Sequence, residues 1–305
     1  MNEPARTDPS RKDSTTMAVQ HLLGSTIHHR ESGTGTPVVF LHGNPTWSHL
    51  WRHVMPAVGE GRLLAPDLIG MGESGKPAIG YDFADHARYL DAWFDALDLR
   101  DVILVGHDWG GALAFDWAAR HPGRVRGIAF TETIVKPMTW EEFPEGGREL
   151  FRAIKTDGIG EAMILDDNAF IEQALPGTVA TALDPTDLDV YRSPYPTRES
   201  RRPLLQWPRS MPLGGEPAKV VARIEAYDRW LAASPEVPKL LITFGPGPGA
   251  MMHEGIVAWC EANIAGLETE RLAAVAGHHT PEDQPALLAG AIAAWADRHA
   301  LRRRP

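Results

Sequence analysis

Cysteine is nearly absent from this 305-residue chain, in which Cys260 is the only one. A single cysteine excludes an intrachain disulfide, and with it the small secreted domains that disulfides hold together. Cys260 follows Trp259 in an apolar stretch with helical spacing. We therefore expect a buried structural thiol and not a nucleophile.

Long apolar runs and an excess of positive charge are also missing. No run is long enough to span a bilayer, and residues 1–17 lack the apolar core of a secretory signal. The net charge of −10 gives no electrostatic attraction to nucleic acid or to an anionic membrane. We expect a cytoplasmic protein that binds neither, with residues 1–17 as a disordered tail.

What the chain does contain is an alternation of short apolar runs and helical patterns. Buried strands are expected at 37–43, near 62–66, at 101–106 and at 124–132, with helices between them. The alternation stops from about 134 to 215, where the chain is helical and punctuated by proline, and then resumes. This order predicts an α/β fold with a mostly parallel central sheet flanked by helices. The core would comprise 18–133 and 216–305, and 134–215 would form an inserted helical cap.

The stretch ILVGHDWGGAL, residues 103–113, has the form of a strand, a glycine-framed turn and a helix. Many hydrolases place a nucleophilic serine at the centre of such a turn, in the pattern G-x-S-x-G. Here the central residue is Asp108, and Gly106, Gly110 and Gly111 leave room for close approach of strand and helix. The alternative is that Asp108 only caps the helix.

A carboxylate at this position suits attack on a saturated carbon. A serine would form an ether there, which water does not cleave, whereas aspartate forms an ester that can be hydrolysed afterwards. Asp108 therefore indicates substitution at an alkyl carbon, with a halide or an epoxide oxygen as the leaving group.

Hydrolysis of the ester requires a base and an acid that orients it. AVAGHHTPEDQP follows the last expected strand and offers His278, with His279 as the rival. We expect no metal site, because adjacent histidines point in different directions and no third ligand is suitably spaced. Glu132 ends the strand at 124–132, whereas the loop GPGPG after the next strand contains no acid, which favours Glu132 over a surface salt-bridge role.

The leaving group requires hydrogen-bond donors. Asn44 lies in a loop after a strand and Trp109 follows the proposed nucleophile, so an amide N–H and an indole N–H could both donate to a halide. The alternatives are an ordinary turn residue for Asn44 and a core residue for Trp109.

Together these residues resemble the haloalkane dehalogenases of the α/β-hydrolase superfamily, in the subgroup whose catalytic acid is a Glu after the sixth strand. The resemblance covers nearly the whole chain after the tail. It is carried by the segments HGNPTWSHLWR, APDLIGMGESGKP, GHDWGGALAFDWAARHP, DDNAFIEQALPG, RRPLLQWPRSMP and PEDQP.

The resemblance implies the following roles: Asp108 as nucleophile, His278 as base, Glu132 as acid, Asn44 and Trp109 as halide donors, and Phe143, Phe151 and Trp207 as pocket residues. It also implies a small halogenated hydrocarbon as substrate, water as co-substrate, a halide product and no cofactor. The His278–His279 pair and the acid-free GPGPG loop depart from the family pattern.

Other functions remain open from the residues alone. An epoxide hydrolase uses Asp in the same turn and two cap tyrosines as acids, and the cap contains Tyr191 and Tyr195. A coelenterazine luciferase shares similar segments, and a non-catalytic ligand receptor could use the same fold. Thr178, just after LPG, is expected near the entrance of the pocket.

Overall fold

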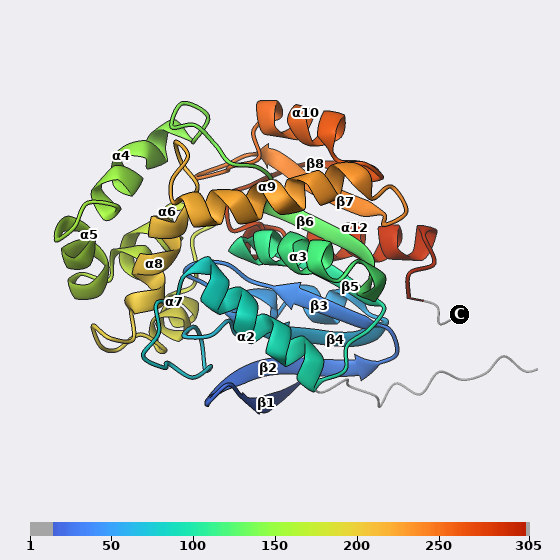
Figure 1. The fold of residues 1–305 in the computed structure, drawn as a ribbon, viewed down its shortest axis with the longest axis horizontal. Coiled ribbons are helices and arrows are strands. Elements are labelled where there is room, and N and C mark those ends of the chain that lie inside the picture. Colours follow the sequence, from blue (N-terminus) through green and yellow to red (C-terminus); the bar gives the residue numbers. More distant parts are fainter. Residues whose placement is uncertain (1–14, 303–305) are drawn as a thin grey trace, which may run out of the picture.

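The computed structural model describes residues 15–302, and its strands form one eight-stranded sheet (Figure 1). The strand order is β1-β2-β4-β3-β5-β6-β7-β8. The strands are β1 (Thr16–Leu22), β2 (Ser25–Thr34), β3 (Pro37–Leu41), β4 (Gly61–Pro66), β5 (Val102–Asp108), β6 (Val125–Thr133), β7 (Lys239–Pro246) and β8 (Leu267–Ala276).

The first fourteen residues of the predicted tail lie outside the described residues. The predicted boundary at residue 17 is too late, because Thr16 and Met17 belong to β1. They pair with Glu31 and Arg30 of β2 in an antiparallel register. The hairpin β1–β2 thus adds an antiparallel edge to a sheet that is parallel from β4 through β8.

The inner strands send alternate side chains into two separate cores, as the two-residue period of a strand requires. Val39 and Leu41 of β3 face the core under α2 (Phe83–Ala96), α3 (Trp109–Arg120) and α9 (Ala218–Ala233). Val38 and Phe40 face the opposite core, under α1 (Val54–Val58) and α12 (Pro285–Arg298). Helices therefore cover both faces of the sheet, as predicted, and central strands such as β5 are buried along their whole length.

Helices also replace the strand pattern between β6 and α9. They are α4 (Glu145–Ile154), α5 (Ile159–Glu161), α6 (Leu175–Gly177), α7 (Pro185–Arg192) and α8 (Arg202–Ser210), with π-helical turns at Ala162–Asp166 and Phe170–Ala174. Figure 1 shows this segment, which we call the cap (134–215), gathered at one end of the sheet. The remaining helices are the 3-10 helices η1 (Ser48–Trp51) and η2 (Pro122–Arg124), and the α-helices α10 (Glu254–Asn263) and α11 (Thr280–Asp283).

The two ends of the cap are joined to each other. The N–H of Met138 donates to the carbonyl of Pro212 at 3.1 Å, and the N–H of Gly214 donates to the carbonyl of Met138 at 3.0 Å. The chain therefore leaves the sheet and returns to it through a single hydrogen-bonded neck.

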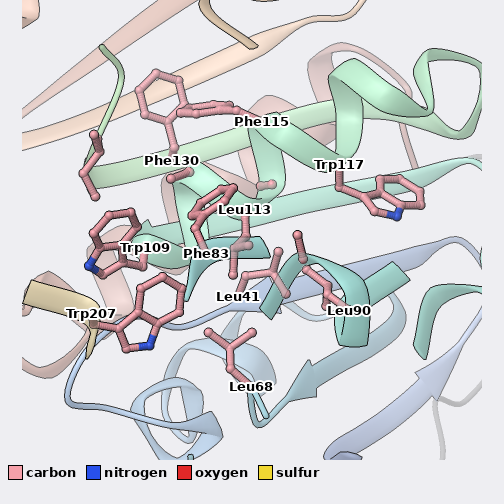
Figure 2. Packing of buried hydrophobic residues seen from close by; sticks show 14 of the residues in the cluster. Leu41, Leu68, Phe83, Leu90, Trp109, Leu113, Phe115, Trp117, Phe130 and Trp207 are labelled. Carbon is pink, nitrogen blue, oxygen red and sulfur yellow. The ribbon is translucent and has the colours of Figure 1, made fainter. Parts of the chain in front are cut away.

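An aromatic stack joins the cap to the core beneath it (Figure 2). Trp207 of α8 stacks on Trp109 at the start of α3, with ring centroids 4.7 Å apart, and on His86 of α2 at 4.0 Å. Phe83 packs against both tryptophans. Trp207 has no exposed surface, so α8 is held against α2 and α3 by buried aromatic area.

Two further predictions concern single features. Cys260 is a free, buried thiol, and burial raises its pKa to about 12, in keeping with a structural role. None of the helices within residues 15–302 is long and apolar enough to cross a membrane.

Candidate active site

Asp108 lies at the sharp turn between β5 and α3, with φ of 50° and ψ of −129°. Such a backbone conformation is costly for a residue other than glycine and is typical of functional sites. The turn needs small neighbours: a Cβ on Gly110 would lie 2.0 Å from the carbonyl oxygen of Leu41, and one on Gly106 would lie 2.4 Å from Cα of Gly111. The side chain of Asp108 makes no helix-cap hydrogen bond, so it does not serve as the helix cap.

The carboxylate of Asp108 is held by main-chain amides. Its Oδ2 accepts a hydrogen bond from the N–H of Asn44 at 2.8 Å. Burial raises the pKa of Asp108, whereas the charge of His278 and the main-chain N–H groups of Asn44 and Trp109 act in the opposite direction. The amides thus favour the ionised form in a site that is only 6% exposed.

His278 lies between Asp108 and Glu132. Its Nδ1 is 3.3 Å from Oε2 of Glu132, and its Nε2 is 3.8 Å from Oδ1 of Asp108. Burial lowers the pKa of His278, but the hydrogen bond with Glu132 and the charges of both carboxylates outweigh burial and raise it above 6.5. The structure therefore brings together the three residues that the sequence predicts as nucleophile, base and acid.

Glu132 is itself fixed by the segment that follows β7. Its Oε2 accepts from the N–H of Met251 at 2.6 Å, and its Oε1 accepts from the N–H of Met252 at 3.2 Å. These donors are main-chain N–H groups that follow the acid-free GPGPG loop, so no side-chain motif in the sequence predicts them. They orient the carboxylate while leaving Oε2 within reach of His278.

The neighbouring histidines have other partners. Nδ1 of His279 is 2.9 Å from Oγ1 of Thr178, and because that hydroxyl donates to the carbonyl of Ala174, the imidazole is the donor. Nε2–H of His107 donates to the carbonyl of His278 at 2.7 Å. Burial is the largest influence lowering the pKa of His107 and His279 well below 6.5, which favours the neutral form of both. His107 thus supports the main chain of His278, and among the described residues neither histidine forms a hydrogen bond or ion pair with the carboxylate of Asp108.

A cavity of about 540 Å³ opens above Asp108. Asn44, Trp109, His278, His279 and Thr178 line it, as do Phe143 and Phe151 of the cap. Most of the wall is apolar and comes from residues that the sequence reasoning did not single out: Pro144, Leu150, Ile164, Ala169, Phe170, Ala174, Pro208, Met211 and Met251. Such a wall suits an apolar substrate with few hydrogen-bonding groups.

Trp207 departs from its predicted role as a pocket residue. It is not among the residues that line the cavity; it lies behind Trp109, and its indole N–H donates to Sδ of Met71 at 3.1 Å. The physical reason is the stack on Trp109 and His86, which uses both faces of the indole.

The two cap tyrosines, Tyr191 and Tyr195, also lie outside the cavity lining. The hydroxyl of Tyr191 donates to Glu282, and Tyr195 is buried without lining the cavity. Neither hydroxyl is therefore available to protonate an epoxide oxygen above Asp108. In the part of the chain that the structure describes, no group of three or more His, Cys, Asp or Glu residues is arranged to hold a metal ion.

Comparison with known proteins identifies the relatives of this chain. Residues 36–155 match the alpha/beta hydrolase fold family. A haloalkane dehalogenase of Mesorhizobium japonicum is 46% identical over 297 residues, which are 96% of this chain and 93% of that protein. A haloalkane dehalogenase of Sphingobium indicum is 45% identical over 91% of this chain and 94% of its own. The crystal structure of haloalkane dehalogenase DbeA from Bradyrhizobium elkani USDA94 aligns with a TM-score of 0.90 and 44% identity, covering 94% of this chain and 99% of that one.

Proposed function

This chain belongs to the haloalkane dehalogenases, hydrolases of the α/β-hydrolase fold that act on carbon–halide bonds, and we propose from that premise how its own residues divide the reaction. The substrate is a small halogenated hydrocarbon, and the products are an alcohol, a halide and a proton. The observation that carries the proposal is the Asp108–His278–Glu132 arrangement at the base of an apolar cavity.

The first step is substitution at the carbon that bears the halogen. Oδ2 of Asp108 is engaged by the N–H of Asn44, which leaves Oδ1 as the attacking oxygen. The carbon–oxygen bond forms as the carbon–halogen bond breaks, and the halide leaves with the bonding electron pair. The side-chain amide of Asn44 and the indole N–H of Trp109 donate to the halogen as its negative charge develops.

Substitution also prepares the base. Before it, the charge of Asp108 helps to raise the pKa of His278. Esterification removes that charge, so the pKa of His278 falls and the neutral imidazole becomes more populated. The substitution step therefore forms the ester and also increases the fraction of His278 that is neutral and can act as the base in its hydrolysis.

The second step is hydrolysis of the ester. His278 takes a proton from water, the resulting hydroxide oxygen bonds to the carboxyl carbon of Asp108, and the carbon–oxygen bond to the alkoxide then breaks. The proton on His278 passes to the alcohol oxygen, and Glu132 stabilises the imidazolium in the interval. The carboxylic acid left on Asp108 then loses its proton to solvent, which regenerates the nucleophile and accounts for the proton among the products. The main-chain N–H groups of Asn44 and Trp109 stabilise the oxyanion on the former carboxylate.

Trapping of the ester tests this assignment. His278→Phe keeps a flat ring but supplies no proton acceptor, so with excess 1-bromobutane it should accumulate a butyl adduct on the peptide that contains Asp108. His279→Phe is the matched control and should turn over without accumulating the adduct. Intact-protein mass spectrometry followed by peptide mapping distinguishes the two. Adduct in the control alone would exchange the roles of the two histidines, and adduct in neither would contradict the two-step mechanism.

The organisation of the chain is part of the same proposal. Residues 16–133 and 216–302 form the catalytic core, and residues 134–215 form a cap that supplies most of the apolar cavity wall. The cytoplasmic location expected from the sequence stays a prediction.

A further inference from the structure

The carboxylate of Asp283 joins two parts of the molecule that are about a hundred residues apart. Its Oδ2 accepts from the N–H of Gly277 at 2.7 Å and from the N–H of Ala180 at 2.9 Å. Its Oδ1 accepts from the N–H of Thr181 at 2.8 Å. Gly277 directly precedes His278, whereas Ala180 and Thr181 belong to the cap. One side chain therefore binds the histidine-bearing loop and the cap at once.

The two parts are in direct contact at this place. The N–H of His279 donates to the carbonyl of Thr178 at 3.3 Å, and a Cβ on Gly277 would lie only 2.3 Å from that carbonyl oxygen. Thr178 lines the cavity. The two cap residues that Asp283 binds, Ala180 and Thr181, therefore come within three positions after Thr178 in the sequence.

Asp283 lies at the end of the short helix α11, and the preceding residue, Glu282, holds this helix in place. Glu282 forms a bidentate ion pair with Arg52, at 2.6 and 2.8 Å, and accepts a hydrogen bond from Tyr191 of the cap. Glu282 is 5% exposed at its side chain, so this ion pair is largely shielded from water. The Glu282–Arg52 pair fixes α11 on the core, and Asp283 reaches from α11 to the other two segments.

We propose that Asp283 is a positioning residue for His278, and that it sets the position of this base by fastening the loop that carries it to the cap. Asp283 lies outside the cavity and touches no reacting atom. It acts by holding the N–H of Gly277, and the cap amides on the same carboxylate restrict how far that loop moves. The inference rests on the proposed role of His278 as the base of the hydrolytic step.

The effect should be confined to one step of the reaction. Substitution by Asp108 requires no base, whereas hydrolysis requires His278 to be correctly placed. A displacement of about 1 Å can lower a rate by about a hundredfold. We expect Asp283→Ala to slow ester hydrolysis by about tenfold or more and to leave the rate of substitution within about twofold of wild type.

The experiment measures both rates by rapid quench and records the alkylated fraction during turnover of 1-bromobutane by intact-protein mass spectrometry. Asp283→Ala should accumulate the ester, which simple loss of folded enzyme would not produce. Asp283→Asn keeps one acceptor oxygen and should recover part of the hydrolysis rate. Asp184→Ala is the matched control, because Asp184 is a cap carboxylate that binds a main-chain amide of the cap itself, that of Thr186 at 2.8 Å, and not one of the loop that carries His278.

Hydrogen exchange of the wild-type protein provides a second measurement, which holds even if Asp283→Ala does not fold. The amides of Gly277, Ala180 and Thr181 should all be protected and should lose protection together as denaturant is added. Unprotected cap amides beside a protected Gly277 would overturn the proposal, as would a folded Asp283→Ala that clears the ester at the wild-type rate. A wild-type enzyme that forms no ester at all would instead contradict the proposed function.

Discussion

The indole of Trp207 stacks on the indole of Trp109 with ring centroids 4.7 Å apart and planes inclined by 26°. Trp207 belongs to the cap, and Trp109 follows the nucleophile. The position of the cap therefore affects the position of Trp109, a proposed halide donor. Trp109 also lines the cavity.

Replacement of Trp207 should therefore affect stability and chemistry together. Trp207→Leu removes the stack on Trp109 and His86 and leaves a buried void, and we expect the free energy of unfolding to fall by about 2–4 kcal/mol. Carbon–halogen cleavage should slow as well, because Trp109 loses its support. Urea denaturation and single-turnover halide release measure the two effects. Trp140→Leu, at a half-buried cap tryptophan, should cost less stability and leave cleavage unchanged.

The two functions of Asn44 can be separated by truncating its side chain. Asn44→Ala keeps the main-chain N–H that binds Asp108 and removes the amide proposed to bind the halide. Hydrogen bonds to charged groups contribute about 1.5–3 kcal/mol, so cleavage should slow by about tenfold or more. Trp109→Leu should have an effect of similar size on the same step. Asn263→Ala, on helix α10, is the control, and a single-turnover cleavage rate equal to that of wild type in both site variants would exclude them as donors.

The pH dependence of ester hydrolysis should report the Glu132–His278 pair. Hydrolysis requires neutral His278, so its rate should rise as pH increases through the pKa of this residue. Glu132 stabilises the protonated imidazole and raises that pKa. Glu132→Gln removes the negative charge, so the midpoint of the profile should move to lower pH, and the plateau rate should fall because the imidazolium loses its stabilising partner.

A surface pair of the same kind provides the control for that profile. Glu268 binds His299 at the surface, so Glu268→Gln removes an equivalent interaction far from the cavity. Rapid-quench rates from pH 5 to 9 give the profiles. An unchanged midpoint in Glu132→Gln would show that this carboxylate does not act on His278.

Gly43 leaves the space that the nucleophile occupies. A Cβ at this position would lie 2.2 Å from Oδ2 of Asp108, within a carboxylate that has little freedom to move. Gly43→Ala should displace Asp108 from its N–H donor and slow substitution by about a hundredfold. Gly123→Ala, where a Cβ meets nothing within 4 Å, should be neutral. Halide release in a single turnover checks the expectation, and a fully active, folded Gly43→Ala would refute it.

The fold was predictable because its signals are local. The central strand β5 begins with a continuous apolar run, whereas the helices around it show apolar residues at helical spacing, and the glycines near Asp108 mark the turn between strand and helix. The nucleophile could be assigned because the chemistry of an ester intermediate distinguishes Asp from Ser at one position. These inferences require no knowledge of contacts between distant segments.

The remaining features depend on such contacts. His278 and His279 differ in what surrounds them, since Glu132 lies 146 positions from the first and Thr178 lies 101 positions from the second. Trp207 could be placed near the cavity by its segment, but which way its ring turns depends on Trp109 and His86. Thr16 and Met17, the start of β1, were assigned to the tail because only their pairing with β2 marks them as part of the strand.

The two ends of the cap meet at the hydrogen-bonded neck formed by Met138, Pro212 and Gly214, so the whole cap can be exchanged as one unit. Cuts made at the neck leave every strand of the sheet intact, so a cap grafted from a relative would bring a differently shaped cavity wall to an unchanged nucleophile. Whether such a graft fits the core would depend on the contacts that the cap makes with Trp109 and with Asp283. New substrate ranges would then arise by recombination across this boundary, with the chemistry inherited intact.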